Sequence, residues 1–62
     1  MDISETIATK FEALRPFLDE RRRRLWAAAE ALALGRGGVT LVAAATGLHR
    51  NTIGEEIGRA HV

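Results

Sequence analysis

Residues 37–53 read Gly-Gly-Val-Thr-Leu-Val-Ala-Ala-Ala-Thr-Gly-Leu-His-Arg-Asn-Thr-Ile, and this stretch decides the predicted fold. Its first part places apolar residues three and four positions apart, which indicates one face of a short helix. Gly47 can adopt the left-handed backbone conformation that ends a helix without a Cβ clash. Leu48 and Ile53 then return apolar side chains to the interior. The spacing is typical of a helix-turn-helix, so we predict a second helix that begins near Arg50.

Two further helices are predicted before this stretch. The first covers about residues 3–15, with Asp2 as its N-cap and Glu5 completing a capping box. Pro16 ends it, because the residue before a proline is disfavoured in the helical region. The second starts at Asp19, a favourable N-cap, and runs to about residue 34.

The sequence contains no strand pattern and therefore predicts an all-α fold: a small three- to four-helix domain that contains a helix-turn-helix. Its parts are two N-terminal helices in 1–34, a glycine-rich connector at 35–38, the helix-turn-helix in 39–56, of which the first helix spans about 39–46, and a tail at 57–62. We expect the core to consist of Ile7, Phe11, Leu14, Phe17, Leu25, Trp26, Leu32, Val39, Val42, Leu48 and Ile53. The second helix carries one apolar stripe, formed by Leu18, Leu25, Ala28, Ala29 and Leu32.

Composition limits the class of protein. With 62 residues the chain forms one domain at most, and it has no cysteine for a disulfide or a thiolate metal site. No apolar run approaches membrane-spanning length and no signal peptide is visible, so we expect a cytoplasmic protein without a membrane partner. The formal net charge is only +1, which predicts modest DNA affinity for the chain alone.

The candidate functional residues lie at the start of the last predicted helix. Arg50, Asn51 and Thr52 occupy the positions from which a recognition helix contacts bases and phosphates, and His49 precedes them in the turn. Arginine can pair with guanine, asparagine with adenine, and threonine can contact a phosphate or a thymine methyl. The alternative is an ordinary polar first turn of an exposed helix. Residues 55–56, both glutamates, are expected one turn further on, where they would repel phosphate.

The run of four arginines at 21–24 does not form one basic face, because consecutive helical residues point in different directions. We expect Asp19 to pair with Arg23 and Glu20 with Arg24. Contact with phosphate or with partner subunits stays an alternative for this run. Trp26 is expected to pack over a neighbouring helix. We find no catalytic arrangement, metal set or cofactor motif, and we expect no enzyme activity and no small-molecule ligand.

A resemblance covers nearly the whole chain up to Ile53. Phe-Glu-Ala-Leu-Arg-Pro at 11–16, Leu-Asp-Glu-Arg at 18–21, Arg-Arg-Leu-Trp-Ala-Ala-Ala-Glu-Ala at 23–31 and the stretch 37–53 together resemble the N-terminus of ISAzo-type bacterial insertion-sequence transposases. The resemblance implies a segment that recognises the ends of the element in double-stranded DNA. It also implies a separate catalytic domain with metal-binding carboxylates, none of which matches a residue here.

The resemblance has departures. His49 stands where the family usually has serine, and residues 54–55 stand where it tends to be basic. Residues 57–62 correspond to a translation of ATC GGA AGA GCA CAC GTC, which resembles a widely used sequencing adapter. We therefore expect a non-native tail after Glu56 as a hypothesis that the nucleotide sequence tests.

Three functions stay open from the sequence. The first is a DNA-binding module of a transposase. The second is a small helical interaction or oligomerisation module, which includes a homo-oligomer. The third is a non-functional gene fragment. Affinity for DNA that falls with salt favours the first, dimerisation without DNA binding favours the second, and an unfolded chain favours the third.

Overall fold

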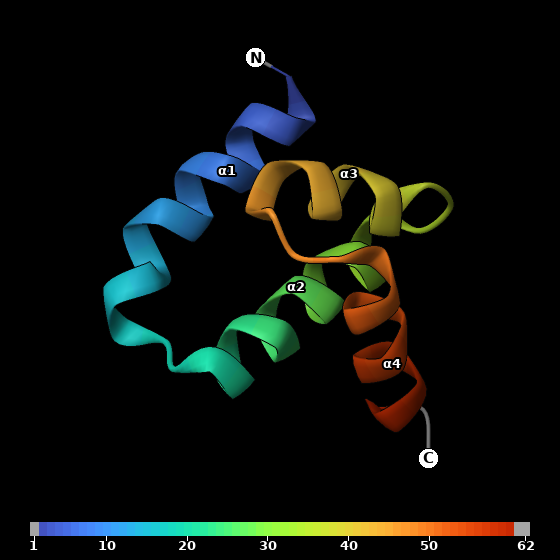
Figure 1. The fold of residues 1–62 in the computed structure, drawn as a ribbon. Coiled ribbons are helices and arrows are strands. Elements are labelled where there is room, and N and C mark those ends of the chain that lie inside the picture. Colours follow the sequence, from blue (N-terminus) through green and yellow to red (C-terminus); the bar gives the residue numbers. More distant parts are fainter. Residues whose placement is uncertain (1, 61–62) are drawn as a thin grey trace.

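The chain folds into helices joined by short connections (Figure 1). The computed structural model describes residues 2–60, and within them the elements are α1 (Ile3–Leu14), the 3-10 turn η1 (Arg15–Phe17), α2 (Glu20–Leu34), α3 (Gly38–Thr46) and α4 (Arg50–Ala60). No strand occurs between residues 2 and 60. The predicted all-α class is therefore confirmed, and the described residues form four α-helices where three to four were predicted.

The helix boundaries follow local side-chain chemistry. Asp19 begins α2 as predicted, because its carboxylate accepts a hydrogen bond from the Arg22 amide at 2.8 Å. Asp2 precedes α1 but makes no such bond to the helix backbone. Its carboxylate accepts the Ser4 hydroxyl at 2.8 Å instead, so the predicted capping box with Glu5 is wrong. A side-chain partner two residues away competes for the same oxygens.

Helix α2 is the element around which α3 and α4 pack, while α1 packs against α3 (Figure 1). The inward face of α2 is made of alanines rather than leucines. Because alanine is small, α3 and α4 approach the α2 backbone closely. The fully or almost fully buried apolar side chains are Ile7, Phe11, Ala27, Ala28, Ala31, Val42 and Ile53.

Gly38 shows how close the approach is. It is buried and forms the first residue of α3, one residue earlier than predicted. A Cβ at this position would collide with the carbonyl oxygen of Ala31 and lie 3.0 Å from the Leu34 Cβ. Only glycine fits between these two helices without displacement of the backbone.

The expected core is correct in part. Ile7, Phe11, Val42 and Ile53 are buried as predicted. Among the remaining predicted core residues, Trp26, Val39 and Leu48 are half-buried against the buried cluster. Four core predictions are wrong, because the side chains are exposed: Leu14 (37%), Phe17 (77%), Leu25 (44%) and Leu32 (46%).

The error on α2 has one geometric cause. Of the predicted stripe, Ala28 is buried and Leu18 is half-buried, but Leu25, Ala29 and Leu32 lie on the exposed side of α2. Ala27, Ala31 and Leu34 recur at helical spacing on the covered side. The prediction placed the leucines in the core because they are more hydrophobic than alanine. In the structure the alanines are buried instead, because their small side chains let the three helices pack closely. Trp26 lies at the edge of the packed face and stacks beside Phe11 of α1, with ring centroids 5.6 Å apart.

Candidate nucleic-acid interface

The connection between α3 and α4 is fixed by its own hydrogen bonds. Gly47 has φ +79°, the left-handed conformation predicted for it, and its amide donates to the Ala43 carbonyl at 2.9 Å. The Thr46 hydroxyl donates to the Val42 carbonyl at 2.8 Å and accepts the Leu48 amide at 3.2 Å. Half-buried Leu48 packs against the core cluster. The turn therefore sets the position at which α4 begins.

His49 caps the N-terminus of α4. Its Nδ1 accepts a hydrogen bond from the Asn51 amide at 3.1 Å, and its carbonyl accepts the Ile53 amide at 3.2 Å. One of the four free amides at the start of a helix is thereby satisfied by a side chain. His49 was predicted as a DNA-contacting residue at a position where serine would cap the helix better, and a cap by the histidine itself was not predicted. The available signal was its position directly before the helix, which serine, threonine, aspartate and asparagine usually occupy.

The four predicted site residues are consecutive: His49 directly precedes α4, and the other three begin its first turn. His49, Arg50 and Asn51 are exposed, and Thr52 is half-buried. Within residues 2–60, the Arg50 guanidinium forms no ion pair. An unpaired arginine beside a helix N-terminus is a suitable environment for an anion, because the helix dipole adds partial positive charge there.

The opposite side of α4 is anchored in the protein. Ile53 is 0% exposed, and half-buried Ile57 packs against the same cluster. Ile57 and Arg59 belong to the predicted 57–62 tail, and α4 continues across the boundary at Glu56 without interruption up to Ala60. Residues 61–62 of that tail lie outside the described residues.

Glu56 does not face the expected binding surface. It is 5% exposed, and its Oε1 lies 3.6 Å from both the Arg24 Nε of α2 and the Arg59 Nη1. The expectation that both acidic residues of this turn repel phosphate is wrong for Glu56. Its helical position, three residues after Ile53, places it on the anchored side. Glu55 is exposed.

The exposed side of α4 has few long side chains. Asn51, Gly54, Glu55 and Gly58 follow one another at helical spacing and are all exposed. Of these, only Glu55 is charged. A surface approaching α4 from this side would meet Arg50 and Asn51 at one end and mostly backbone beyond them.

The arginine run of α2 divides between two environments. Arg21 and Arg22 are exposed, whereas Arg23 and Arg24 are half-buried. Arg24 pairs with Glu20 at 3.4 Å as predicted. The predicted pair of Asp19 with Arg23 is wrong: Arg23 donates to the Arg15 carbonyl at 3.1 Å, and Asp19 caps the helix. Arg23 and Arg24 therefore tie η1 and α4 to α2, whereas Arg21 and Arg22 form no ion pair within residues 2–60.

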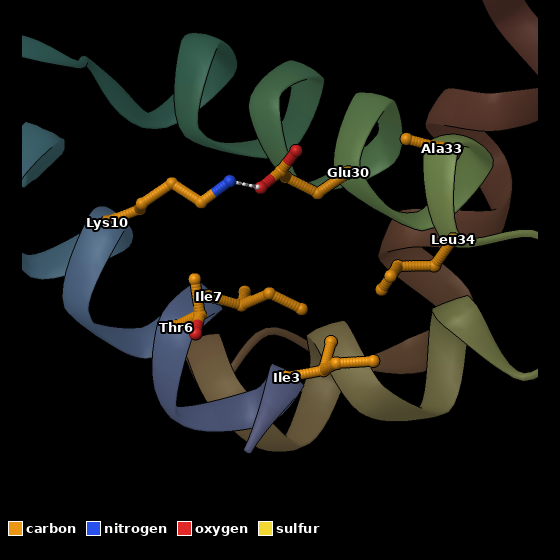
Figure 2. Close-up of a pocket in the computed structure, with 7 residues that line it drawn as sticks. All are labelled: Ile3, Thr6, Ile7, Lys10, Glu30, Ala33 and Leu34. Carbon is orange, nitrogen blue, oxygen red and sulfur yellow. Dashed lines mark ion pairs between the residues drawn. The ribbon is translucent and has the colours of Figure 1, made fainter. Parts of the chain in front are cut away.

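A pocket of about 290 Å³ opens between α1 and α2, away from the start of α4 (Figure 2). Figure 2 shows Lys10 and Glu30 joined across one side of it, with their Nζ and Oε1 atoms 2.8 Å apart. Its volume is at the lower limit of ligand pockets. The lining residues are Ile3, Thr6, Ile7, Lys10, Glu30, Ala33 and Leu34. Its polar side chains are the Lys10–Glu30 ion pair and Thr6, whose hydroxyl donates to the Asp2 carbonyl at 3.3 Å.

In the part of the chain that the structure describes, no three histidine, cysteine or acidic side chains gather as a metal site would require. Likewise, none of the described helices combines the length and the apolar character that crossing a membrane demands. No family model, curated protein or solved structure matches the chain.

Proposed function

We propose that this chain is a DNA-binding module in which α3 and α4 act as a helix-turn-helix. In this proposal α3 lies across the phosphate backbone and α4 presents its first turn to the major groove. The observation that carries the proposal is the exposed, polar first turn of α4, which follows the fixed turn at Gly47 and is held from behind by buried Ile53. A rigid support for exposed polar side chains is what base recognition requires.

Each residue of the first turn has a proposed role. Arg50 pairs with a guanine or a phosphate, since its guanidinium is exposed and forms no ion pair within residues 2–60. Asn51 is exposed next to it and suits an adenine edge. Thr52 is half-buried, which favours a phosphate contact over deep insertion. His49 orients the turn through its Nδ1 bond to the Asn51 amide and leaves Nε2 for a phosphate.

Charge limits the affinity in this proposal. The net charge is +1, and exposed Glu55 lies on the side of α4 that continues from Asn51. Each phosphate contact releases counterions, so the affinity that does exist should fall steeply as salt rises. We therefore propose modest binding by the isolated chain, strengthened when several copies or further domains contact the same DNA.

The biological role that we propose rests on the sequence resemblance to ISAzo-type transposases. We propose that the chain recognises the ends of such an element during transposition, in the cytoplasm of a bacterium, and that it has no catalytic residue, metal or cofactor of its own. The arrangement of α3 and α4 supports this role because element ends are read as double-stranded DNA. A small-molecule ligand has no part in it.

The test measures binding to three duplexes: one with the terminal inverted repeat of an ISAzo-type element, one with its shuffled sequence, and one selected from a random library by the chain itself. Fluorescence anisotropy at increasing salt gives the affinity and its salt dependence. The proposal predicts tighter binding to the inverted repeat than to the shuffled duplex, and a loss of affinity with salt for both. Equal binding to repeat and shuffled DNA, together with a discriminating selected site, would retain the DNA-binding module and reject the transposase role.

A matched pair of variants locates the interface. Arg50→Ala and Arg36→Ala each remove one exposed arginine and change the net charge equally, but Arg36 lies in the connection before α3. Arg50→Ala should weaken specific binding by about 1–3 kcal/mol, and Arg36→Ala should not alter the preference between duplexes. Equal effects of both variants would exclude the proposed reading turn.

A further inference from the structure

Helix α2 carries a second line of apolar side chains that stays partly exposed within residues 2–60. Leu25, Ala29 and Leu32 follow one another at spacings of four and three residues, so they lie in one line on its outer side. Leu25 is 44% exposed and Leu32 is 46% exposed. This outer face is opposite to the alanine face that packs on α3 and α4. Two exposed leucines in line on a domain with so small a core indicate an interaction surface.

The shape of the outer face suits another helix. The two leucines are about 10 Å apart along the helix axis, since seven residues separate them. Ala29 lies between them and is exposed, so the smallest side chain of the line is flanked by two large ones. One large apolar side chain from a facing helix fits over such an alanine, as a knob does in a hole.

The charges beside the outer face are basic. Arg21 and Arg22 lie one turn before Leu25 on either side of the same line, and both are exposed. Within residues 2–60 neither side chain forms an ion pair. The nearby carboxylates are engaged elsewhere: Glu20 pairs with Arg24, and Asp19 caps α2. The outer face therefore presents two unpaired positive charges at its N-terminal end.

We propose that the outer face of α2 binds an acidic amphipathic helix of another protein or domain. The partner helix places a large apolar residue over Ala29 and carboxylates against Arg21 and Arg22. A second copy of this chain fits less well, because the outer face supplies arginines and no carboxylate to meet them. The proposal is independent of the DNA-binding function, which uses the first turn of α4.

The probe is a synthetic helical peptide with leucine at the apolar heptad positions and glutamate at the flanking positions. Its control is the same peptide with lysine in place of glutamate. Titration into the isotope-labelled protein should shift the backbone amides of residues 21–33, with an affinity for the glutamate peptide a few-fold to about tenfold higher than for the lysine peptide. Equal affinity for the two peptides, or no binding of either, would overturn the proposal.

Three variants distinguish the outer face from other surfaces. Leu25→Gln combined with Leu32→Gln should weaken glutamate-peptide binding by roughly tenfold or more. Phe17→Gln removes a more exposed apolar side chain (77%) outside the face and should leave the affinity unchanged. Arg21→Glu combined with Arg22→Glu should reverse the preference toward the lysine peptide. Because all of these positions are exposed, circular dichroism should show the folded helical content in each variant.

Two measurements separate this proposal from its competitors. Sedimentation of the unliganded protein should show a monomer, and self-association that the two leucine substitutions abolish would identify a second copy as the occupant instead. Duplex DNA binding should be unaffected by the leucine substitutions. Loss of DNA binding in the arginine variant without any peptide binding would assign Arg21 and Arg22 to phosphate contact and overturn the proposal.

Discussion

The two sides of α4 differ in what holds them. One side is anchored: Ile53 is fully buried and Glu56 is nearly so, paired with Arg24 of α2. The other side is free: Arg50 and Asn51 are exposed, and two of the next exposed positions along it are glycines. The difference indicates that the anchored side determines whether α4 is in place, whereas the free side determines what α4 contacts. Substitutions on the two sides should therefore separate folding from binding.

The largest effect is expected from Ile53→Ala on the anchored side. Removing this fully buried side chain leaves a cavity between α4 and the rest of the core. The free energy of unfolding should fall by about 2–5 kcal/mol, which is enough to unfold much of a domain of this size. Urea denaturation followed by helical circular dichroism measures it. An unchanged midpoint would show that α4 does not pack as described.

Gly47→Val should have the next largest effect. The glycine has φ +79°, and nothing lies within 4 Å of where a Cβ would be, so the cost comes from backbone strain rather than from a clash. A β-branched residue in this conformation should reduce the free energy of unfolding by about 1–3 kcal/mol. Gly47→Asn is the matched control, because asparagine tolerates the left-handed region better. The two variants should differ clearly in their urea midpoints, and equal midpoints would contradict the role of the turn.

His49→Ala tests the boundary between the two sides. The substitution removes the Nδ1 acceptor of the Asn51 amide and should reduce the free energy of unfolding by about 1 kcal/mol. His49→Ser supplies another capping oxygen and should restore most of that loss, as thermal denaturation of the three proteins would show. If the serine variant is as unstable as the alanine variant, the capping role of this position is incorrect.

Glu55→Gln should give the smallest effect, and only on binding. Glu55 is exposed on the free side, so its neutralisation should leave the urea midpoint within about 0.5 kcal/mol of the wild type. Loss of its repulsion of phosphate should improve DNA affinity by about 0.3–1 kcal/mol at low salt, with the gain shrinking as salt rises. Glu12→Gln, an equal charge change on α1, provides the control for net charge. Equal gains from both would show that Glu55 is not near the DNA.

Much of the fold was predictable from local signals. Asp19, Pro16 and Gly47 each have a steric or hydrogen-bonding effect that acts within a few residues, and the helix boundaries they predict agree with the structure to within one residue or so. The side of α2 that faces the core was not predictable in this way. The leucine stripe and the alanine stripe both have helical spacing, and only the close approach of α3 at Gly38 selects the second.

The candidate site was predictable as a position but not as a set of contacts. The spacing after Gly47 placed residues 49–52 together on one turn, and the structure has them there. The cap made by His49 depends on the rotation of its side chain, which the sequence does not specify. The burial of Glu56 depends on Arg24, thirty-two positions earlier in the chain, and local spacing contains no information about that pair.

We propose above all that the first turn of α4 contacts DNA while the buried side of the helix holds it in place. The most direct measurement compares Arg50→Ala with the wild type in two assays on the same samples: unfolding in urea and binding to the duplex that the chain itself selects. We expect an unfolding free energy within about 0.5 kcal/mol of the wild type and a loss of about 1–3 kcal/mol in specific binding. Unaltered DNA affinity in a folded Arg50→Ala protein would contradict it.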